Sequence, residues 1–316
     1  MIYYMSPDDL LTTPSDADNV ALADVRELLV IGAGGKMGPS LVERARRAAP
    51  HARIVAVARR GGDISADLLD PEQVNALPDS DNVIFLAGRK FGSTGDEGLT
   101  WATNALLPAL IAERYRDARI VALSSGNVYP LTRDGATEET PPDPAGEYAQ
   151  SVLARERIFE YFSGRYRTRM ALLRLNYAID VRYGVLLDIG RRVFARQPVS
   201  VTMGAVNVIW QGDANSVVLR SLALAASPPF ILNVTGPRVR VRDLAERFGR
   251  KFGIVPEFEG REAETALLSD ASLCHRLLGP PSVPLEEMIE MVAEWIRSGK
   301  PTLPRPTHFE VRDGKF

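Results

Sequence analysis

Cysteine and histidine are scarce in this sequence. Cys274 is the only cysteine among 316 residues, so no disulfide can form within the chain, which fits a reducing cytoplasm. The three histidines, His51, His275 and His308, are scattered, and the sequence holds no paired-carboxylate motif. Because a metal site needs several such ligands in a recognisable arrangement, we expect no metal.

An excess of charge and long apolar runs are absent as well. Lys and Arg number 38 against 40 Asp and Glu, a net charge of −2 that gives no reason to expect nucleic acid or an anionic membrane as partner. No uncharged apolar run could span a bilayer, and Asp8 and Asp9 follow the apolar residues 1–5 too closely for a signal peptide. We therefore expect a cytoplasmic enzyme with a small-molecule substrate, and leave a homodimer open.

Glycine is concentrated where the chain first turns after an apolar run. Residues 28–31 read as a buried parallel strand, and a helix is predicted from Pro39 or Ser40. Between them stand Gly32, Ala33, Gly34, Gly35, Lys36, Met37 and Gly38. Glycines at 32, 35 and 38 let the backbone approach a pyrophosphate, which the helix N-terminus attracts. Such a turn can be only a turn, but its place between strand and helix predicts a dinucleotide site.

From residue 28 onward, strand and helix patterns alternate. This alternation predicts a Rossmann-type α/β fold, a doubly wound parallel sheet with helices on both faces. The predicted strands are 28–31, 53–57, 83–88, 119–123, 169–173 and 230–234, with a further strand at 206–210. The predicted helices are 39–49, 100–116, 148–162, 190–197, 213–224 and 241–252, preceded by short helices at 6–11 and 20–25. Residues 67–77 are predicted as a short strand end followed by a helix.

Several sequence blocks in a fixed order resemble one family. After the glycine turn come Phe85-Leu86-Ala87-Gly88, Asn104, Leu123-Ser124-Ser125-Gly126-Asn127-Val128-Tyr129, Tyr148-Ala149-Gln150-Ser151-Val152-Leu153-Ala154-Arg155-Glu156, Asn233-Val234-Thr235-Gly236 and Val241-Arg242-Asp243-Leu244-Ala245. From about residue 28 to 295 the chain is similar to the extended short-chain dehydrogenases/reductases of the NAD-dependent epimerase/dehydratase type, which include nucleotide-sugar epimerases.

The resemblance implies roles for individual residues. Gly32, Gly35 and Gly38 match the cofactor loop, Ala87 and Gly88 match a turn on the adenosine side, and Asn104 matches a residue that supports the site. Ser125 matches the serine that orients the reacting oxygen, and Tyr148 matches the acid/base that exchanges its proton. Asn127 and Asn176 are expected substrate contacts. Read alone, such a tyrosine is more often a core residue and such a serine pair a cap.

The sequence departs from the family at one catalytic position. The family pattern is Tyr-x-x-x-Lys, but Val152 stands four residues after Tyr148. A unit charge about 6 Å from the phenol would lower its pKa by about two units, so without the lysine we expect a neutral phenol at pH 7. Arg155 lies on nearly the same helical face. We expect it to face solvent, with replacement of the missing charge as the alternative.

The second strand is followed by arginines rather than by an acid. Cofactor sites for NAD place Asp or Glu at this point to bind the ribose hydroxyls, whereas arginine suits the extra phosphate of NADP. Arg59 and Arg60 follow Ala58, and the first acid is Asp63. The sequence therefore favours NADP over NAD. The alternative is a pair of solvated loop arginines.

Together these features predict an NAD(P)-dependent epimerase, dehydratase or other oxidoreductase acting on a sugar nucleotide or a related hydroxyl or carbonyl substrate. The alternative is a catalytically impaired NAD(P)-binding sensor of the same fold, which Val152 favours. The resemblance also implies a smaller C-terminal substrate lobe. We expect an N-terminal extension at 1–26, a cofactor domain at 27–175 plus roughly 206–235, and a substrate lobe and tail at 176–205 plus 236–316.

Overall fold

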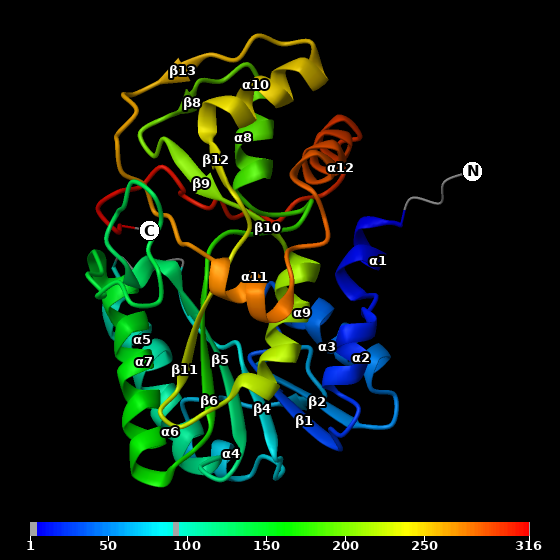
Figure 1. Ribbon diagram of the computed structural model, residues 1–316, viewed down its shortest axis with the longest axis vertical. Coiled ribbons are helices and arrows are strands. Elements are labelled where there is room, and N and C mark those ends of the chain that lie inside the picture. Colours follow the sequence, from blue (N-terminus) through cyan, green and yellow to red (C-terminus); the bar gives the residue numbers. More distant parts are fainter. Residues whose placement is uncertain (1–4, 91–94, 316) are drawn as a thin grey trace.

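The computed structural model describes residues 5–90 and 95–315. Its centre is a seven-stranded sheet in the order β11-β6-β5-β4-β1-β2-β3, with all neighbours parallel (Figure 1). Parallel neighbours need crossover connections, so helices cover both faces, and the predicted doubly wound fold is confirmed. The strands are β1 (Glu27–Ile31), β2 (Arg53–Ala58), β3 (Ile64–Ser65), β4 (Asn82–Phe85), β5 (Arg119–Ser125), β6 (Met170–Leu175) and β11 (Phe230–Val234).

Side chains of alternate residues in the strands pack into two separate buried clusters. In β1, Leu28 and Val30 pack with one cluster of buried side chains, and Leu29 and Ile31 pack with the other. The first cluster is covered by α3 (Gly38–Ala48), α9 (Gln211–Arg220) and α11 (Ser272–Leu278). The second is covered by α4 (Pro71–Asn75), α6 (Leu107–Arg114) and α7 (Gly146–Tyr166), with α5 (Glu97–Trp101) and the π-helix η1 (Ala102–Leu106) leading into α6.

A third buried cluster lies in the second lobe, above the sheet in Figure 1. Three helices pack on one another there: α8 (Val185–Phe194), α10 (Val241–Phe252) and α12 (Leu285–Arg297). Three strand pairs complete it: β7 (Ala178–Ile179) with β10 (Ile209–Trp210), β9 (Ala205–Asn207) with β12 (Arg238–Arg240), and β8 (Val199–Ser200) with β13 (Phe258–Glu259). The short helices η2 (Gly126–Val128) and η3 (Ser221–Leu224) follow β5 and α9.

The N-terminal helices pack on two helices that cover the central sheet, and the C-terminal tail packs in the second lobe. Helices α1 (Pro7–Thr12) and α2 (Asp16–Ala21) pack on α3 and α9, where Asp18 forms a buried ion pair of 2.7 Å with Arg44. In the tail, Phe309 is buried in the third cluster. Residues 1–4 of the predicted extension and residue 316 of the predicted tail lie outside the described residues. None of the helices described is long and apolar enough to cross a membrane.

Several predicted elements are wrong in their bounds or type. The strand predicted at 83–88 ends at Phe85, and of the segment 67–77 only Pro71–Asn75 is helical. The helix predicted at 20–25 covers Asp16–Ala21 instead, because the capping box of Ser15 and Asp18 starts α2 earlier. The predicted strand 206–210 is split at Val208, where the chain passes between two different strand pairs. The predicted helix 100–116 is three helical segments, one of them a π-helix. The helix predicted at 190–197 is α8, which covers Val185–Phe194, so that Gly190 lies inside it, where a Cβ would lie 2.8 Å from Ile296 Cδ1.

Candidate active site

The carboxyl ends of four neighbouring strands border one cavity of about 290 Å³. Strands β6, β5, β4 and β1 lie side by side, and ligands of such sheets bind at this edge, where the strand order reverses. The segments that follow β1, β4, β5 and β6 contribute Gly32, Gly35, Lys36, Met37, Gly38, Gly88, Arg89, Lys90, Asn127, Asn176, Tyr177 and Ala178, and the strand ends add Ser124 and Ser125. Helix α7 adds Tyr148 and Arg155.

The glycine loop has two glycines that the fold requires and one that leaves space. Gly32 has φ of +85°, and a Cβ there would lie 2.5 Å from the nitrogen of Ala87. A Cβ at Gly38 would lie 2.1 Å from the carbonyl oxygen of Ala33. At Gly35 the nearest atom would be a carbonyl oxygen at 3.4 Å, so this position borders open space. No described side chain caps the N-terminus of α3, whose amides remain available to an anion.

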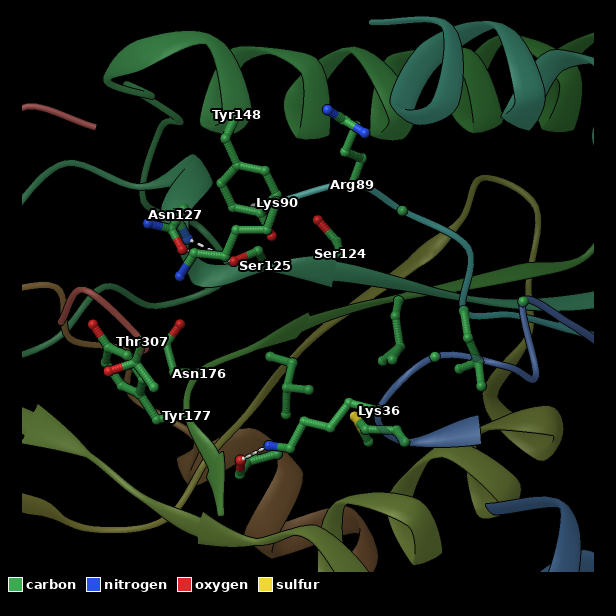
Figure 2. A pocket seen from close by; sticks show the side chains of 18 of the residues that line it. Lys36, Arg89, Lys90, Ser124, Ser125, Asn127, Tyr148, Asn176, Tyr177 and Thr307 are labelled. Carbon is green, nitrogen blue, oxygen red and sulfur yellow. Dashed lines mark hydrogen bonds between the residues drawn. The ribbon is translucent and has the colours of Figure 1, made fainter. Parts of the chain in front are cut away.

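Ser125 and Tyr148 lie together on one wall of the cavity (Figure 2). Burial raises the pKa of Tyr148, while a hydrogen bond with Ser125 and the charge of Arg155 act in the opposite direction. The Ser125 hydroxyl donates to Asn127 Oδ1 at 2.9 Å and accepts from the Asn127 amide at 3.2 Å. The phenol is therefore neutral at pH 7, as expected from the sequence, and its hydroxyl partner is the predicted serine.

Arg155 is a member of the site, and the expectation that it faces solvent is wrong. Its side chain is only 5% exposed, because the guanidinium finds acceptors inside the protein. It donates to the carbonyl of Leu123 at 2.7 Å and to Asn104 Oδ1 at 2.7 Å. Its Nε has no acceptor among the residues that the structure describes. A positive charge therefore acts on Tyr148, although the residue four positions after it is Val152 and not a lysine.

Asn104 lies behind the cavity rather than on its wall. The side chain is fully buried on the π-helix η1. Its Oδ1 accepts from the Arg89 amide at 2.9 Å, and its Nδ2 donates to the Arg89 carbonyl and to Ser151 Oγ, both at 2.9 Å. Asn104 thus joins the segment after β4 to helix α7 and to Arg155.

Val152 does not border the cavity and belongs to a small apolar cluster, against which Tyr148 also packs. Its side chain is 0% exposed and packs with Val128, Tyr129 and Ala136. A charged group at this position would lie among apolar side chains, although Tyr148 is one turn away.

Val152→Lys should therefore lower the free energy of unfolding by about 3 kcal/mol or more, because it buries an unpaired ammonium. Gln150→Lys places the same residue on the exposed face of the same helix and should change stability by less than about 0.5 kcal/mol. Urea unfolding of both variants measures the difference. Equal stability of the two would show that the side chain at 152 can reach solvent or the cavity.

A buried polar network holds the end of β5 next to the site. Ser124 donates to Glu156, and Glu156 accepts from Arg174 Nε at 3.0 Å and from its NH2 at 2.6 Å. Arg174 also donates to the Tyr129 hydroxyl at 2.7 Å, which donates to Asn233 at 2.9 Å. Because Glu156 and Arg174 are 0% and 2% exposed, this pair has little access to water.

Some predicted site residues lie outside the cavity. Arg59 and Arg60 are exposed beyond β2, while Asp63 accepts from the Ala56 amide at 2.7 Å and from Arg46. Gly34 is exposed, and Ala87 packs against Gly32 without lining the cavity. Asn176 does line it, as predicted, with its Nδ2 donating to Ser269 Oγ at 3.1 Å.

Residues from three further segments line the cavity and were not predicted from the sequence. Arg89 and Lys90 follow β4, and their position directly after Gly88 at a strand end could have indicated that they line the site. Tyr183 comes from the segment before α8, and Thr307 comes from the C-terminal tail, where no periodicity marks it. Within the described ranges, the structure brings no three His, Cys, Asp or Glu side chains together as metal ligands.

Comparisons with known proteins agree with this arrangement. Residues 28–179 match the model of the NAD dependent epimerase/dehydratase family, and no curated protein matches the chain. Three solved structures each align with 86% of this chain and 99% of their own: MoeE5 in complex with UDP-glucose and NAD (22% identity, TM-score 0.73), UDP-glucose 4-epimerase of Thermotoga maritima with UDP-glucose (17%, 0.73) and RMD of Pseudomonas aeruginosa complexed with NADPH (22%, 0.72). At these identities they show a shared fold. Residues 28–179, just under half of the chain, are thus similar to the NAD dependent epimerase/dehydratase family.

Proposed function

We propose that this protein is an NAD(P)-dependent epimerase, dehydratase or reductase that acts on a sugar nucleotide or a related hydroxyl or carbonyl substrate. One observation carries the proposal: the hydrogen-bonded pair Ser125 and Tyr148 borders the same cavity as the glycine loop. MoeE5 is in complex with UDP-glucose and NAD, and RMD is complexed with NADPH. These ligands of proteins with a similar fold support a sugar nucleotide as the substrate and a nicotinamide dinucleotide as the cofactor.

The residues of the glycine loop fit a nicotinamide dinucleotide. The close packing at Gly32 and Gly38 fixes the loop, and the open space at Gly35 leaves room for a pyrophosphate near the uncapped start of α3. When bound, the nicotinamide would exchange a hydride with the substrate carbon. The predicted loop residues Gly34, Lys36 and Met37 complete this proposed site.

Tyr148 and Ser125 would manage the proton of the reacting oxygen. Because burial raises the pKa of Tyr148, its hydroxyl keeps a proton at pH 7 and can donate it to a developing alkoxide. Ser125 would orient that oxygen, with Asn127 and Asn176 as further substrate contacts. Arg155 would supply the charge that the family lysine supplies elsewhere, since its charge acts on Tyr148 and both side chains border the cavity.

The cofactor preference is proposed to be NADP. Arg59 and Arg60 are exposed where β2 ends, and a phosphate could reach both. Asp63 is already engaged by Ala56 and Arg46, so it is poorly placed to bind ribose hydroxyls. Ala87 and Gly88 would lie on the adenosine side. We further propose that the chain is divided into a cofactor domain (27–175 plus roughly 206–235) and a discontinuous substrate lobe with the tail (176–205 plus 236–316).

The alternative is a catalytically impaired NAD(P)-binding sensor of the same fold. The absence of a lysine at Val152 favours it, because the apolar side chain at this position supplies no charge beside Tyr148. The buried charge of Arg155 weakens this argument. We therefore favour the enzyme.

Titration calorimetry with NAD and NADP tests the proposal. The unmodified protein should bind a dinucleotide, NADP more tightly by about tenfold because a charge-assisted contact contributes about 1.5–3 kcal/mol. Gly35→Leu should abolish binding without unfolding the protein, because its side chain would fill the open space of the loop. Gly164→Leu, at a helical glycine with no neighbour within 4 Å, is the matched control. Failure of the unmodified protein to bind either dinucleotide would refute the proposed function.

A further inference from the structure

The C-terminal tail contributes a side chain to the cavity, although it follows the last helix that the structure describes. The tail leaves α12 in the second lobe, and the side chain in question is that of Thr307. Figure 2 shows Thr307 on the side of the cavity where Asn176 and Tyr177 lie. Because Asn176 is a proposed substrate contact, the tail borders the part of the cavity that we assign to the substrate.

The tail is fixed to the second lobe on both sides of Thr307. Before it, the Leu303 amide donates to the carbonyl oxygen of Arg182 at 2.9 Å. After it, the Arg312 guanidinium donates to the carbonyl oxygen of Thr265 at 2.6 Å and to its Oγ1 at 2.9 Å. Chain ends that are tied down in this way are ordered, so Thr307 has a defined position in the cavity wall.

The end of the tail lies against the start of α7, the helix that carries Tyr148. A Cβ at Gly314 would lie 2.0 Å from the carbonyl oxygen of Ala145, and a Cβ at Gly146 would lie 2.5 Å from the carbonyl oxygen of Gly314. The two backbones are therefore in direct contact. The tail, red in Figure 1, thus connects α12 in the second lobe with α7 beside the central sheet, and it borders the cavity at Thr307.

Two hydrogen bonds fix the orientation of the Thr307 side chain. Its amide and its hydroxyl both donate to Oδ2 of Asp188 on α8, at 2.8 Å and 2.6 Å. Because Asp188 takes the hydroxyl proton, Thr307 has no proton left to donate to a ligand. The γ-methyl group makes no such bond and is available for an apolar contact. The side chain is only 3% exposed, so it has little freedom to move aside for a ligand.

We propose that the tail forms a wall of the substrate site, and that Thr307 is a specificity-determining residue that packs against the sugar of a sugar nucleotide and limits its size. This assignment rests on the proposed function, which places the sugar beside Tyr148 and Asn176. One methylene more or less in a fitted apolar contact changes affinity by about 10-fold to 200-fold, so a single side chain is enough to select among sugars.

Two substitutions separate the volume of Thr307 from its hydrogen bond. Thr307→Leu should weaken the binding of a sugar nucleotide at least about tenfold, because the larger side chain occupies the space of the sugar. Thr307→Val keeps the shape and loses only the hydroxyl bond to Asp188, so the affinity should stay within about twofold. Calorimetry with UDP-glucose, UDP-galactose, UDP-glucuronic acid and UDP-N-acetylglucosamine, with and without NADP, measures both effects.

Thr302→Leu is the matched control, since it makes the same change in the same tail at a side chain that does not line the cavity. It should leave the sugar-nucleotide affinities unchanged, and NADP affinity should be unchanged in all of these variants. Melting temperatures show whether Thr307→Leu is folded. If it is not, Thr307→Ser decides the question, because it keeps the hydroxyl and removes only the methyl group. It should weaken binding by about fourfold.

Equal losses of affinity in Thr307→Val and Thr307→Leu would show that Thr307 only anchors the tail, and would overturn the proposed wall. Undiminished affinity in a folded Thr307→Leu variant, or in Thr307→Ser when that variant decides, overturns it too. So does a loss of NADP binding in Thr307→Leu, or a protein that binds NADP but none of the four sugar nucleotides.

The outcomes also separate the wall from the proposed function. A protein that binds neither NAD nor NADP, but whose affinity for a sugar nucleotide falls in Thr307→Leu and not in Thr307→Val, refutes the function and supports the wall. A protein that binds no dinucleotide and no sugar nucleotide refutes both.

Discussion

Tyr148→Phe should lower turnover by about 10²-fold to 10⁴-fold, because it removes the only hydroxyl proposed to pass a proton to the substrate. The ring would remain, and the neighbouring Ser125 would keep its bonds to Asn127, so cofactor and substrate affinity should change little. Turnover is measured by the absorbance of reduced nicotinamide, or by product analysis for an epimerase, on a panel of sugar nucleotides.

Tyr161→Phe is the matched control, since Tyr161 is exposed on the same helix. It should retain full activity. Undiminished turnover in Tyr148→Phe would show that the Tyr148 hydroxyl does not transfer the proton. An unmodified protein that binds cofactor but converts none of the panel would favour the sensor.

Glu156→Gln should lower the free energy of unfolding by about 3–5 kcal/mol, because it leaves Arg174 as an uncompensated buried charge. Both side chains are almost fully buried, and Glu156 also accepts from Ser124. The variant preserves shape, so the loss measures charge and hydrogen bonding rather than packing. Urea unfolding gives the value.

Glu160→Gln provides the comparison on the same helix. Glu160 forms an ion pair of 2.7 Å with Arg157, but both side chains reach solvent. Loss of this ion pair in Glu160→Gln should lower the free energy of unfolding by less than about 1 kcal/mol, as for surface ion pairs in general. Similar losses in the two variants would contradict a stabilising role for the buried network.

The centre of the site was predictable because it depends on strand ends. Residues that directly follow parallel strands meet at one edge of the sheet, which brings the glycine loop, Ser125 and Asn176 to one cavity, although the roles of Ser125 and Asn176 were implied by the family resemblance. Tyr148 joined them through the family pattern. Most strand assignments held because each rests on a short buried apolar run, although the predicted strand 206–210 is split in the structure.

Other parts depend on contacts between distant residues. The burial of Arg155 requires acceptors on Asn104 and Leu123, which lie far away in the sequence, so a prediction from residue preference placed it in solvent. The space around Gly190 is likewise set by α10 and α12. Thr307 reaches the cavity through a tail without periodicity, and nothing in its neighbours signals that position.

The most direct test of the proposed site is a crystal structure of the protein with bound NADPH. We predict density for the pyrophosphate at Gly35 and the start of α3, with the nicotinamide ring beside Tyr148 and Ser125. Phosphate density beside Arg59 and Arg60 would agree with the proposed preference. A dinucleotide bound elsewhere, or bound at the glycine loop with its nicotinamide outside the cavity, would contradict the assignment of Tyr148 and Ser125 as the reacting centre.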